Sequence, residues 1–161
     1  GVLHFEEPVP PHDLPGLRQV ADALDVPVSF GEFEVTRWRF RDVIGMGNPD
    51  IIQPDILNCG GLSEMKHICE LAQAFNKPVV PHSPDVGITS FASLHVYATL
   101  PNGTWAHEYS PEGYPDWNVQ QVQDLYEEPV LPVDGKITLS DRPGLGLTLR
   151  EDVLAEVLIN A

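Results

Sequence analysis

The sequence is poor in basic residues, and this deficiency excludes two classes of partner. Lysine and arginine number 9 against 24 aspartates and glutamates, so the formal net charge is −15 over 161 residues. Nucleic acid and anionic membrane surfaces would repel such a chain, and neither is expected as a partner. No apolar run approaches the roughly 20 residues of a membrane-spanning helix. The opening GVLHFEE lacks the basic segment and cleavage site of a signal peptide, so we expect a cytoplasmic protein.

Cysteine and lysine are scarce as well. Cys59 and Cys69 do not form a CxxC pair, so neither a disulfide framework nor a zinc knuckle is indicated. The three lysines fall in a predicted helix, before a predicted strand and in the tail, and none is placed to act as a catalytic base. Hydrophobic residues at 42% and charged residues at 20% are typical of one globular domain with its own core.

Short apolar strands alternate with amphipathic helices through the first two thirds of the chain. The first helix shows the pattern, because Leu17, Val20, Ala21 and Leu24 recur at helical spacing after a capping Asp13. This alternation leaves two architectures, a doubly wound sheet or a β/α barrel. We predict helices at 12–24, 36–46 (with Thr36 as cap), 62–75 and 87–100. We predict one strand that ends at Glu6 and four more within 27–32, 50–55, 78–82 and 105–109.

Each predicted strand ends on an ionisable residue. The intervals between these residues are 26, 23, 27 and 26 positions, about the length of one unit of a barrel that has eight units in ~250 residues. Carboxyl ends of parallel strands converge on one mouth, where barrel active sites form. No G-x-G-x-x-G loop follows any strand, which disfavours the doubly wound alternative. The five strand-end residues are Glu6, Glu32, Asp55, His82 and Glu108.

Glu6 and Glu32 offer hard oxygen ligands from neighbouring strands, which suit magnesium better than zinc. The alternative is a pair of solvated loop carboxylates. Glu7 and Glu34 are expected to point elsewhere, because side chains alternate between the faces of a strand.

Asp55 and His82, also on adjacent strands, could form a dyad in which the carboxylate orients the imidazole and raises its basicity. The alternative is a core histidine bonded to a backbone carbonyl. Glu108 at the next strand end favours the dyad, since a carboxyl there could bind charge that develops on a substrate oxygen. His107 should face away from Glu108.

These features resemble the enolase superfamily, and within it the mandelate racemase and muconate lactonizing enzyme branch. The resembling stretches are FEEPVPP (5–11), GEFEVTRW (31–38), IIQPDILNCGG (51–61), PVVPH (78–82), residues 101–108 and DRPGLGL (141–147). The stretches GEFEVTRW and DRPGLGL are most similar to those of the acid-sugar dehydratases.

The resemblance implies an enzyme that abstracts the proton alpha to a substrate carboxylate and stabilises the enediolate on Mg²⁺. On matching positions, Glu6 and Glu32 would bind the metal, and Asp55 and His82 would form the dyad with His82 as general base or acid. Glu108 would hydrogen-bond the enolised carboxylate. The implied partners are a small carboxylate substrate, namely a sugar acid, and further copies of the chain in a homo-oligomer.

The implied fold class is α/β, the C-terminal part of a TIM-type barrel covering about strands 4–8. Residues 1–109 would form the partial barrel. Residues 110–161 would form an extension whose terminal helix, near Leu154, braces a capping domain. That domain, the first three strands, an aspartate as third metal ligand and any lysine base are absent from these residues, so we expect a fragment or a half completed by another chain. Such a half alone is expected to self-associate or to be poorly soluble.

Four functions remain open. The first is dehydration of a sugar acid, and the second is a racemase or cycloisomerase reaction on the same scaffold, which shares its first step. The third is a non-catalytic half that binds metal weakly or assembles with a partner. The fourth, a zinc amidohydrolase with His82 as ligand, is disfavoured because the chain has no HxH pair.

Overall fold

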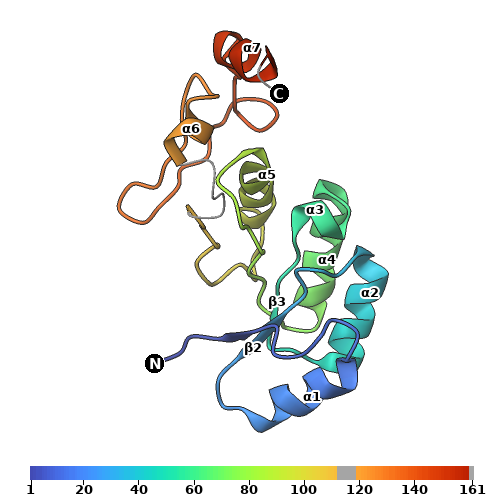
Figure 1. The fold of residues 1–161 in the computed structure, drawn as a ribbon. Coiled ribbons are helices and arrows are strands. Elements are labelled where there is room, and N and C mark those ends of the chain that lie inside the picture. The colour runs from blue at the N-terminus through green and yellow to red at the C-terminus, as the bar shows by residue number, and fades with distance from the viewer. Residues whose placement is uncertain (112–118, 160–161) are drawn as a thin grey trace.

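A small parallel sheet forms the framework of the chain, seen in a computed structural model that describes residues 1–111 and 119–159 (Figure 1). The strand order is β1-β2-β3, and both pairings are parallel. Parallel pairing continues past β3 as two isolated bridges, Ile52 to Val79 and Asp55 to His82. The α/β class predicted from the sequence is therefore confirmed. The strands are β1 (Phe5–Glu6), β2 (Val28–Phe30) and β3 (Ile51–Ile52).

Helices follow the strands in the expected alternation, and the tail adds two more (Figure 1). The short helix after β3, which begins directly after Asp55, was not predicted. The helices are α1 (Leu14–Ala23), α2 (Thr36–Asp42) with its π-helical continuation η1 (Val43–Gly47), α3 (Ile56–Cys59), α4 (Leu62–Ala74), α5 (Ile88–Tyr97), α6 (Val119–Gln123) and α7 (Glu151–Ile159). None of the helices in these two described ranges is long and apolar enough to cross a membrane.

Helix α1 begins as its sequence predicts. The Asp13 side chain accepts a hydrogen bond from the Gly16 N–H at 2.9 Å, and Pro15 occupies the first turn, where a missing N–H costs no hydrogen bond. Leu17 is fully buried against the sheet.

Helix α2 begins differently, and the prediction that Thr36 caps it is wrong. Thr36 is the first helical residue and has a φ of +57°, which β-branched residues rarely adopt. Its neighbour Arg37 donates its backbone N–H to the Glu64 carboxylate of α4 at 2.6 Å. The free N–H of the helix start is thus satisfied by a side chain from another element, which no local pattern could reveal.

Two predicted strands also need correction. Residues 78–82 pair only through the two isolated bridges, and residues 105–109 form no strand. In the second segment, the carbonyl of Trp105 accepts from the Tyr97 hydroxyl, and the carbonyl of Glu108 bonds the His107 ring. Side chains therefore occupy carbonyl groups that a strand ladder would use.

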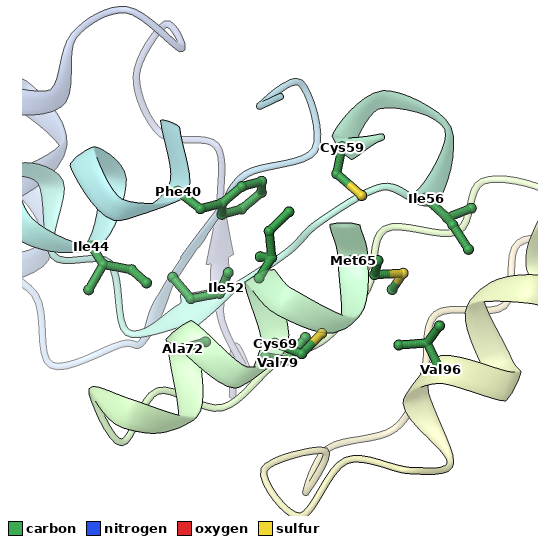
Figure 2. Packing of buried hydrophobic residues seen from close by; sticks show 11 residues of the cluster. Phe40, Ile44, Ile52, Ile56, Cys59, Met65, Cys69, Ala72, Val79 and Val96 are labelled. Atoms are coloured by element: carbon green, nitrogen blue, oxygen red, sulfur yellow. The ribbon is translucent and has the colours of Figure 1, made fainter. Parts of the chain in front are cut away.

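Two hydrophobic clusters join the helices to one face of the sheet. The first packs Leu14 and Leu17 of α1 against Val28 and Phe30 of β2. The second, shown in Figure 2, fills the space between α2, α4, α5 and the residues around β3. Its members are Phe40, Ile44, Ile52, Ile56, Cys59, Met65, Ile68, Cys69, Ala72, Val79 and Val96. Since Phe30 pairs with Ile52 in the sheet, both clusters lie on the same face, and the other face remains for the site.

The two cysteines belong to this second cluster. Both are free thiols and fully buried. Burial raises the pKa of each thiol to about 12. They act as small core residues.

The C-terminal segment 119–159 contacts α5 and the residues just before it. Phe91 and Tyr126 meet edge to face with ring centroids 5.6 Å apart, and the Gln123 amide donates to the Val86 carbonyl at 3.0 Å. Helix α7 contains Leu154, as predicted. The division into units 1–109 and 110–161 and the bracing role of this helix stay predictions.

Candidate functional site

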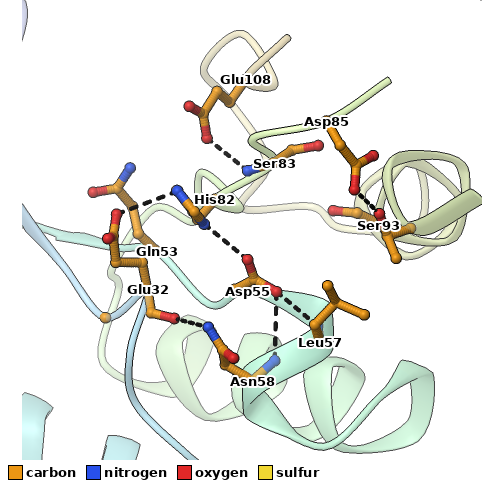
Figure 3. A network of polar contacts seen from close by, with 12 residues as sticks. Glu32, Gln53, Asp55, Leu57, Asn58, His82, Ser83, Asp85, Ser93 and Glu108 are labelled. Carbon is orange, nitrogen blue, oxygen red and sulfur yellow. Dashed lines mark hydrogen bonds and ion pairs between the residues drawn. The ribbon is translucent and has the colours of Figure 1, made fainter. Parts of the chain in front are cut away.

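Polar side chains gather at the carboxyl ends of the parallel strands, where the sequence placed them. Figure 3 shows Glu32, Asp55, His82 and Glu108 around one region, each from a different segment. Glu6 joins the group through Gln53, whose amide donates to its carboxylate at 2.8 Å. All five predicted residues therefore lie in one neighbourhood.

Asp55 and His82 contact each other directly. The Asp55 Oδ2 atom is 2.8 Å from the Nδ1 atom of His82, while Oδ1 accepts the Leu57 N–H at 2.7 Å and caps α3. The two residues also form a parallel bridge through their backbones, so the contact is fixed at both levels. Because an ionised carboxylate only accepts hydrogen bonds, the Nδ1 atom carries the proton and Nε2 is left to face the other carboxylates.

The ionisation of this pair follows from its surroundings. The hydrogen bond that His82 donates to Asp55 raises the pKa of His82, burial opposes the rise, and the negative charges of Glu32 and Glu108 add to it. Burial would raise the pKa of Asp55, but the hydrogen bonds from His82 and the Leu57 N–H lower it below the ordinary value. The imidazole is therefore more basic than a free histidine, as a proton acceptor requires.

Glu32 lies on the far side of the His82 ring. Its Oε2 atom is 3.3 Å from Nε2, and the Asn58 amide holds its backbone carbonyl at 2.9 Å. Burial raises the pKa of Glu32, His82 lowers it, and repulsion from Glu6, Glu108 and Asp55 raises it further. The carboxylate therefore sits among like charges with one imidazole as partner.

Glu108 is anchored to the segment that follows His82. Its Oε2 atom accepts the Ser83 backbone N–H at 2.6 Å, and Oε1 accepts the Ser110 hydroxyl at 3.3 Å. The Ser83 hydroxyl in turn donates to Ser90 of α5 at 3.1 Å. Glu108 is thus held at the rim although its own segment forms no strand.

The carboxylates predicted to point elsewhere do so. Glu7 accepts the Gly31 N–H at 2.7 Å, and Glu34 is buried in an ion pair with Arg39 at 2.7 Å. His107 faces away from the Glu108 carboxyl group, between the Ser93 hydroxyl at 3.0 Å and the Glu108 carbonyl at 2.6 Å.

Sequence reasoning missed three residues that shape the site. Gln53 and Ser83 were passed over because neither ionises, although each directly neighbours the strand end that carries Asp55 or His82. Asp85, which is buried and accepts the Gly87 N–H at 2.9 Å just before α5 begins, was also missed. The sequence pattern IIQPD could have identified Gln53, because Gln53 and Asp55 are two positions apart and therefore share a face.

The donor set around the mouth suits a hard divalent cation. Glu6, Glu32, Asp55 and Glu108 are carboxylates gathered around a single imidazole, so the cluster has an excess of negative charge. Glu6 and Glu32 are the members that neither cap a helix nor hold a neighbouring backbone N–H with their carboxylates. Within residues 1–111 and 119–159, however, no three histidine, cysteine or acidic side chains are arranged to hold a metal. Glu6 and Glu32 offer the type of oxygen ligand that magnesium prefers, and the remaining positions of that ion are usually filled by water and substrate.

Comparison with known proteins places this geometry in context. Residues 1–153 match the family model described as enolase C-terminal domain-like. The chain is 32% identical over 157 residues to arabinonate dehydratase of Saccharolobus solfataricus, covering 97% of this chain and 40% of that protein. It is 33% identical over 158 residues to D-galactarolactone cycloisomerase of Agrobacterium fabrum, covering 97% and 42%.

A solved structure shows the same fold. The mandelate racemase/muconate lactonizing protein of Paracoccus denitrificans PD1222 complexed with magnesium aligns with a TM-score of 0.84 at 36% identity. The alignment covers 94% of this chain and 39% of that one. The chain thus spans about two fifths of the length of the relatives it matches.

Proposed function

The chain belongs to the enolase C-terminal domain-like family, and we propose that it supplies the dyad and two metal ligands of an enzyme that dehydrates a sugar acid. The observation that carries the proposal is the 2.8 Å contact between Asp55 and His82 beside Glu32. The arabinonate dehydratase and the cycloisomerase among its relatives act on compounds of the acid-sugar class named in their descriptions, which favours such a substrate. The proposed setting is a cytoplasmic homo-oligomer.

His82 is the proposed general base. Its Nε2 atom takes the proton from the carbon alpha to the substrate carboxylate, and the electron pair of the broken C–H bond moves into that carboxylate group. Asp55 holds the proton on Nδ1, keeps the ring in place and stabilises the imidazolium that forms. The imidazolium can then return its proton to the hydroxyl that leaves from the next carbon, so that water departs and the resulting enol becomes a keto acid.

Glu6 and Glu32 are the proposed ligands of a magnesium ion. When bound, the ion supplies positive charge beside the substrate carboxylate, where negative charge develops. The proposal draws support from the donor chemistry of the two carboxylates and from the magnesium named in the description of the Paracoccus structure. Glu108, anchored by the Ser83 N–H, is proposed to hydrogen-bond the enolised carboxylate of the substrate.

A racemase or cycloisomerase is the second candidate, because the similarity to D-galactarolactone cycloisomerase is equal in extent to that with the dehydratase. Proton abstraction by His82 is common to both reactions. They differ in the fate of the intermediate, which either loses a hydroxyl or receives a proton. Because the two reactions share this proposed first step, only their products distinguish them.

The test is a screen of acid sugars with Mg²⁺, using the protein expressed from its complete reading frame. A dehydratase yields keto acid, which semicarbazide detects. A racemase and a cycloisomerase both incorporate deuterium from D₂O without forming keto acid, and they differ in whether the compound converted is an open-chain acid or a lactone. His82→Asn should abolish all three reactions. Wild-type protein that shows none of them across the library would overturn the proposal.

A further inference from the structure

Gln53 is a buried amide in the centre of the site. It follows β3 directly, is only 2% exposed and takes no part in the proton transfer described above. The strand register explains its position. Glu6 pairs with Ser29 and Ser29 with Ile51, so these three side chains share one face, and Gln53, two residues after Ile51, lies on that face too. Figure 3 shows its amide beside Glu32 and His82.

The orientation of the Gln53 amide is fixed by its neighbours. Its Nε2 atom donates to the Glu6 Oε1 atom at 2.8 Å. The opposite orientation would set the amide oxygen against a carboxylate oxygen and leave both without a donor. Glu6 therefore keeps one oxygen bound to Gln53 and the other available.

The other half of the amide has no partner. Among the buried side-chain nitrogen and oxygen atoms in the described part of the chain, only Gln53 Oε1 and Asn102 Oδ1 have no hydrogen bond. A buried acceptor without a hydrogen bond destabilises the folded state. The Gln53 acceptor lies in the carboxylate cluster, so its missing donor is best explained by a ligand that brings O–H groups, such as the water shell of a cation.

We propose that Gln53 is a positioning residue that orients the Glu6 carboxylate toward a divalent cation. This inference rests on the proposed function, since it takes Glu6 and Glu32 as cation ligands. Residues that orient metal ligands typically contribute 10–100-fold to metal affinity. Loss of the Gln53 amide should therefore weaken the cation site without removing any ligand from it.

The experiment measures Mn²⁺ affinity by electron paramagnetic resonance, with Mn²⁺ as the probe in place of Mg²⁺. Gln53→Met, which keeps the volume but removes the amide, should weaken Mn²⁺ binding about 10–100-fold. A double-mutant cycle then tests the route. If Gln53 acts through Glu6, the double variant with Glu6→Gln should bind Mn²⁺ no more weakly than Glu6→Gln alone, within about twofold.

Gln123→Met is the matched control. Gln123 is also a fully buried amide, but it donates to the Val86 carbonyl and accepts the Val130 N–H. Loss of this amide should lower the melting temperature in EDTA without changing Mn²⁺ affinity. A purely structural Gln53 would behave in the same way. If Gln53→Met does not fold, Gln53→Asn keeps the amide but is one methylene too short to reach Glu6.

The outcomes separate the two proposals. Wild-type protein without Mn²⁺ binding overturns the proposed function and this inference with it. Wild-type binding that survives in Gln53→Met, or losses that add in the double variant, overturn the inference alone. Failure of both Gln53 variants to fold assigns the residue a structural role and overturns the inference as well.

Discussion

The Oδ2 atom of Asp55 lies 2.8 Å from the Nδ1 atom of His82, and the same aspartate caps α3 with its other oxygen. One carboxylate therefore sets both the start of a helix and the proton position on an imidazole. This double use allows the two roles to be separated by a single substitution, because asparagine is as good a helix cap as aspartate.

Asp55→Asn should preserve the fold and lose activity. The asparagine Oδ1 still accepts the Leu57 N–H, but its NH₂ group faces His82 Nδ1, which must then accept a hydrogen bond. The ring proton moves to Nε2, and that atom can no longer take a proton from the substrate. We expect kcat to fall by about 10²–10⁴-fold with little change in melting temperature.

Asp50→Asn is the control for that substitution. Asp50 likewise accepts a backbone N–H, from Val28 at 2.8 Å, but at the opposite end of β3. Its turnover should stay near that of wild type. Equal turnover in Asp55→Asn and wild type would show that the contact between Asp55 and His82 has no part in catalysis.

Glu32→Gln should weaken Mn²⁺ binding by at least about tenfold, since it removes one of two proposed ligands. Glu7→Gln tests whether any nearby acid has this effect. The Glu7 carboxylate is adjacent in sequence to Glu6 but accepts the Gly31 N–H. Isothermal titration calorimetry on both variants is the measurement, and equal losses in the two would reduce the effect to general electrostatic attraction.

Gly31→Ala should destabilise the fold. Gly31 has a φ of +135°, and a Cβ atom there would lie 2.7 Å from Cε1 of the buried Phe40 ring. Strain and overpacking together should cost about 1–3 kcal/mol of the free energy of unfolding, measured with urea. Gly45→Ala is the control, because no atom lies within 4 Å of its Cβ position and its φ is not positive. That variant should be unchanged or more stable by up to about 1 kcal/mol.

His107 should make stability depend on pH. Burial lowers its pKa, and the Glu108 carbonyl and charge only partly oppose this. The unfolded chain therefore takes up a proton at higher pH than the folded chain, and stability falls as pH drops below about 6.5. His82, whose pKa is raised, contributes in the opposite sense, so comparison with a variant is needed.

The measurement is urea unfolding of wild type and His107→Gln at pH 7.5 and 5.0. The advantage of wild type over the variant should be larger at pH 7.5, where the neutral ring fits between Ser93 and the Glu108 carbonyl. An advantage that grows toward pH 5.0 would contradict a buried neutral histidine.

The alternation of strands and helices was predictable because periodicity is local. Helix α1 shows this best, since Asp13, Pro15 and Leu17 carry its cap, first turn and buried face within one short segment. The strand ends Glu6, Glu32, Asp55 and His82 were predictable for a related reason, because parallel strands with regular spacing must bring their ends together.

The remaining features depend on distant partners. The Arg37 N–H at the start of α2 donates to Glu64, which lies 27 positions later in the chain. Residues 105–109 form no strand, and side chains bond two of their carbonyl groups. Gln53 was missed because its importance lies in a contact with Glu6, 47 positions away, and not in its own chemistry. Each case needs the folded arrangement to become visible.

The burial of Cys59 and Cys69 has a practical consequence. A thiol with a pKa of about 12 stays protonated at neutral pH and reacts slowly, and a core position also denies access to reagents. A thiol-reactive dye should therefore mark only molecules whose interior has opened, and its rate of incorporation counts those openings. The chain carries its own folding reporter, with no label to be engineered.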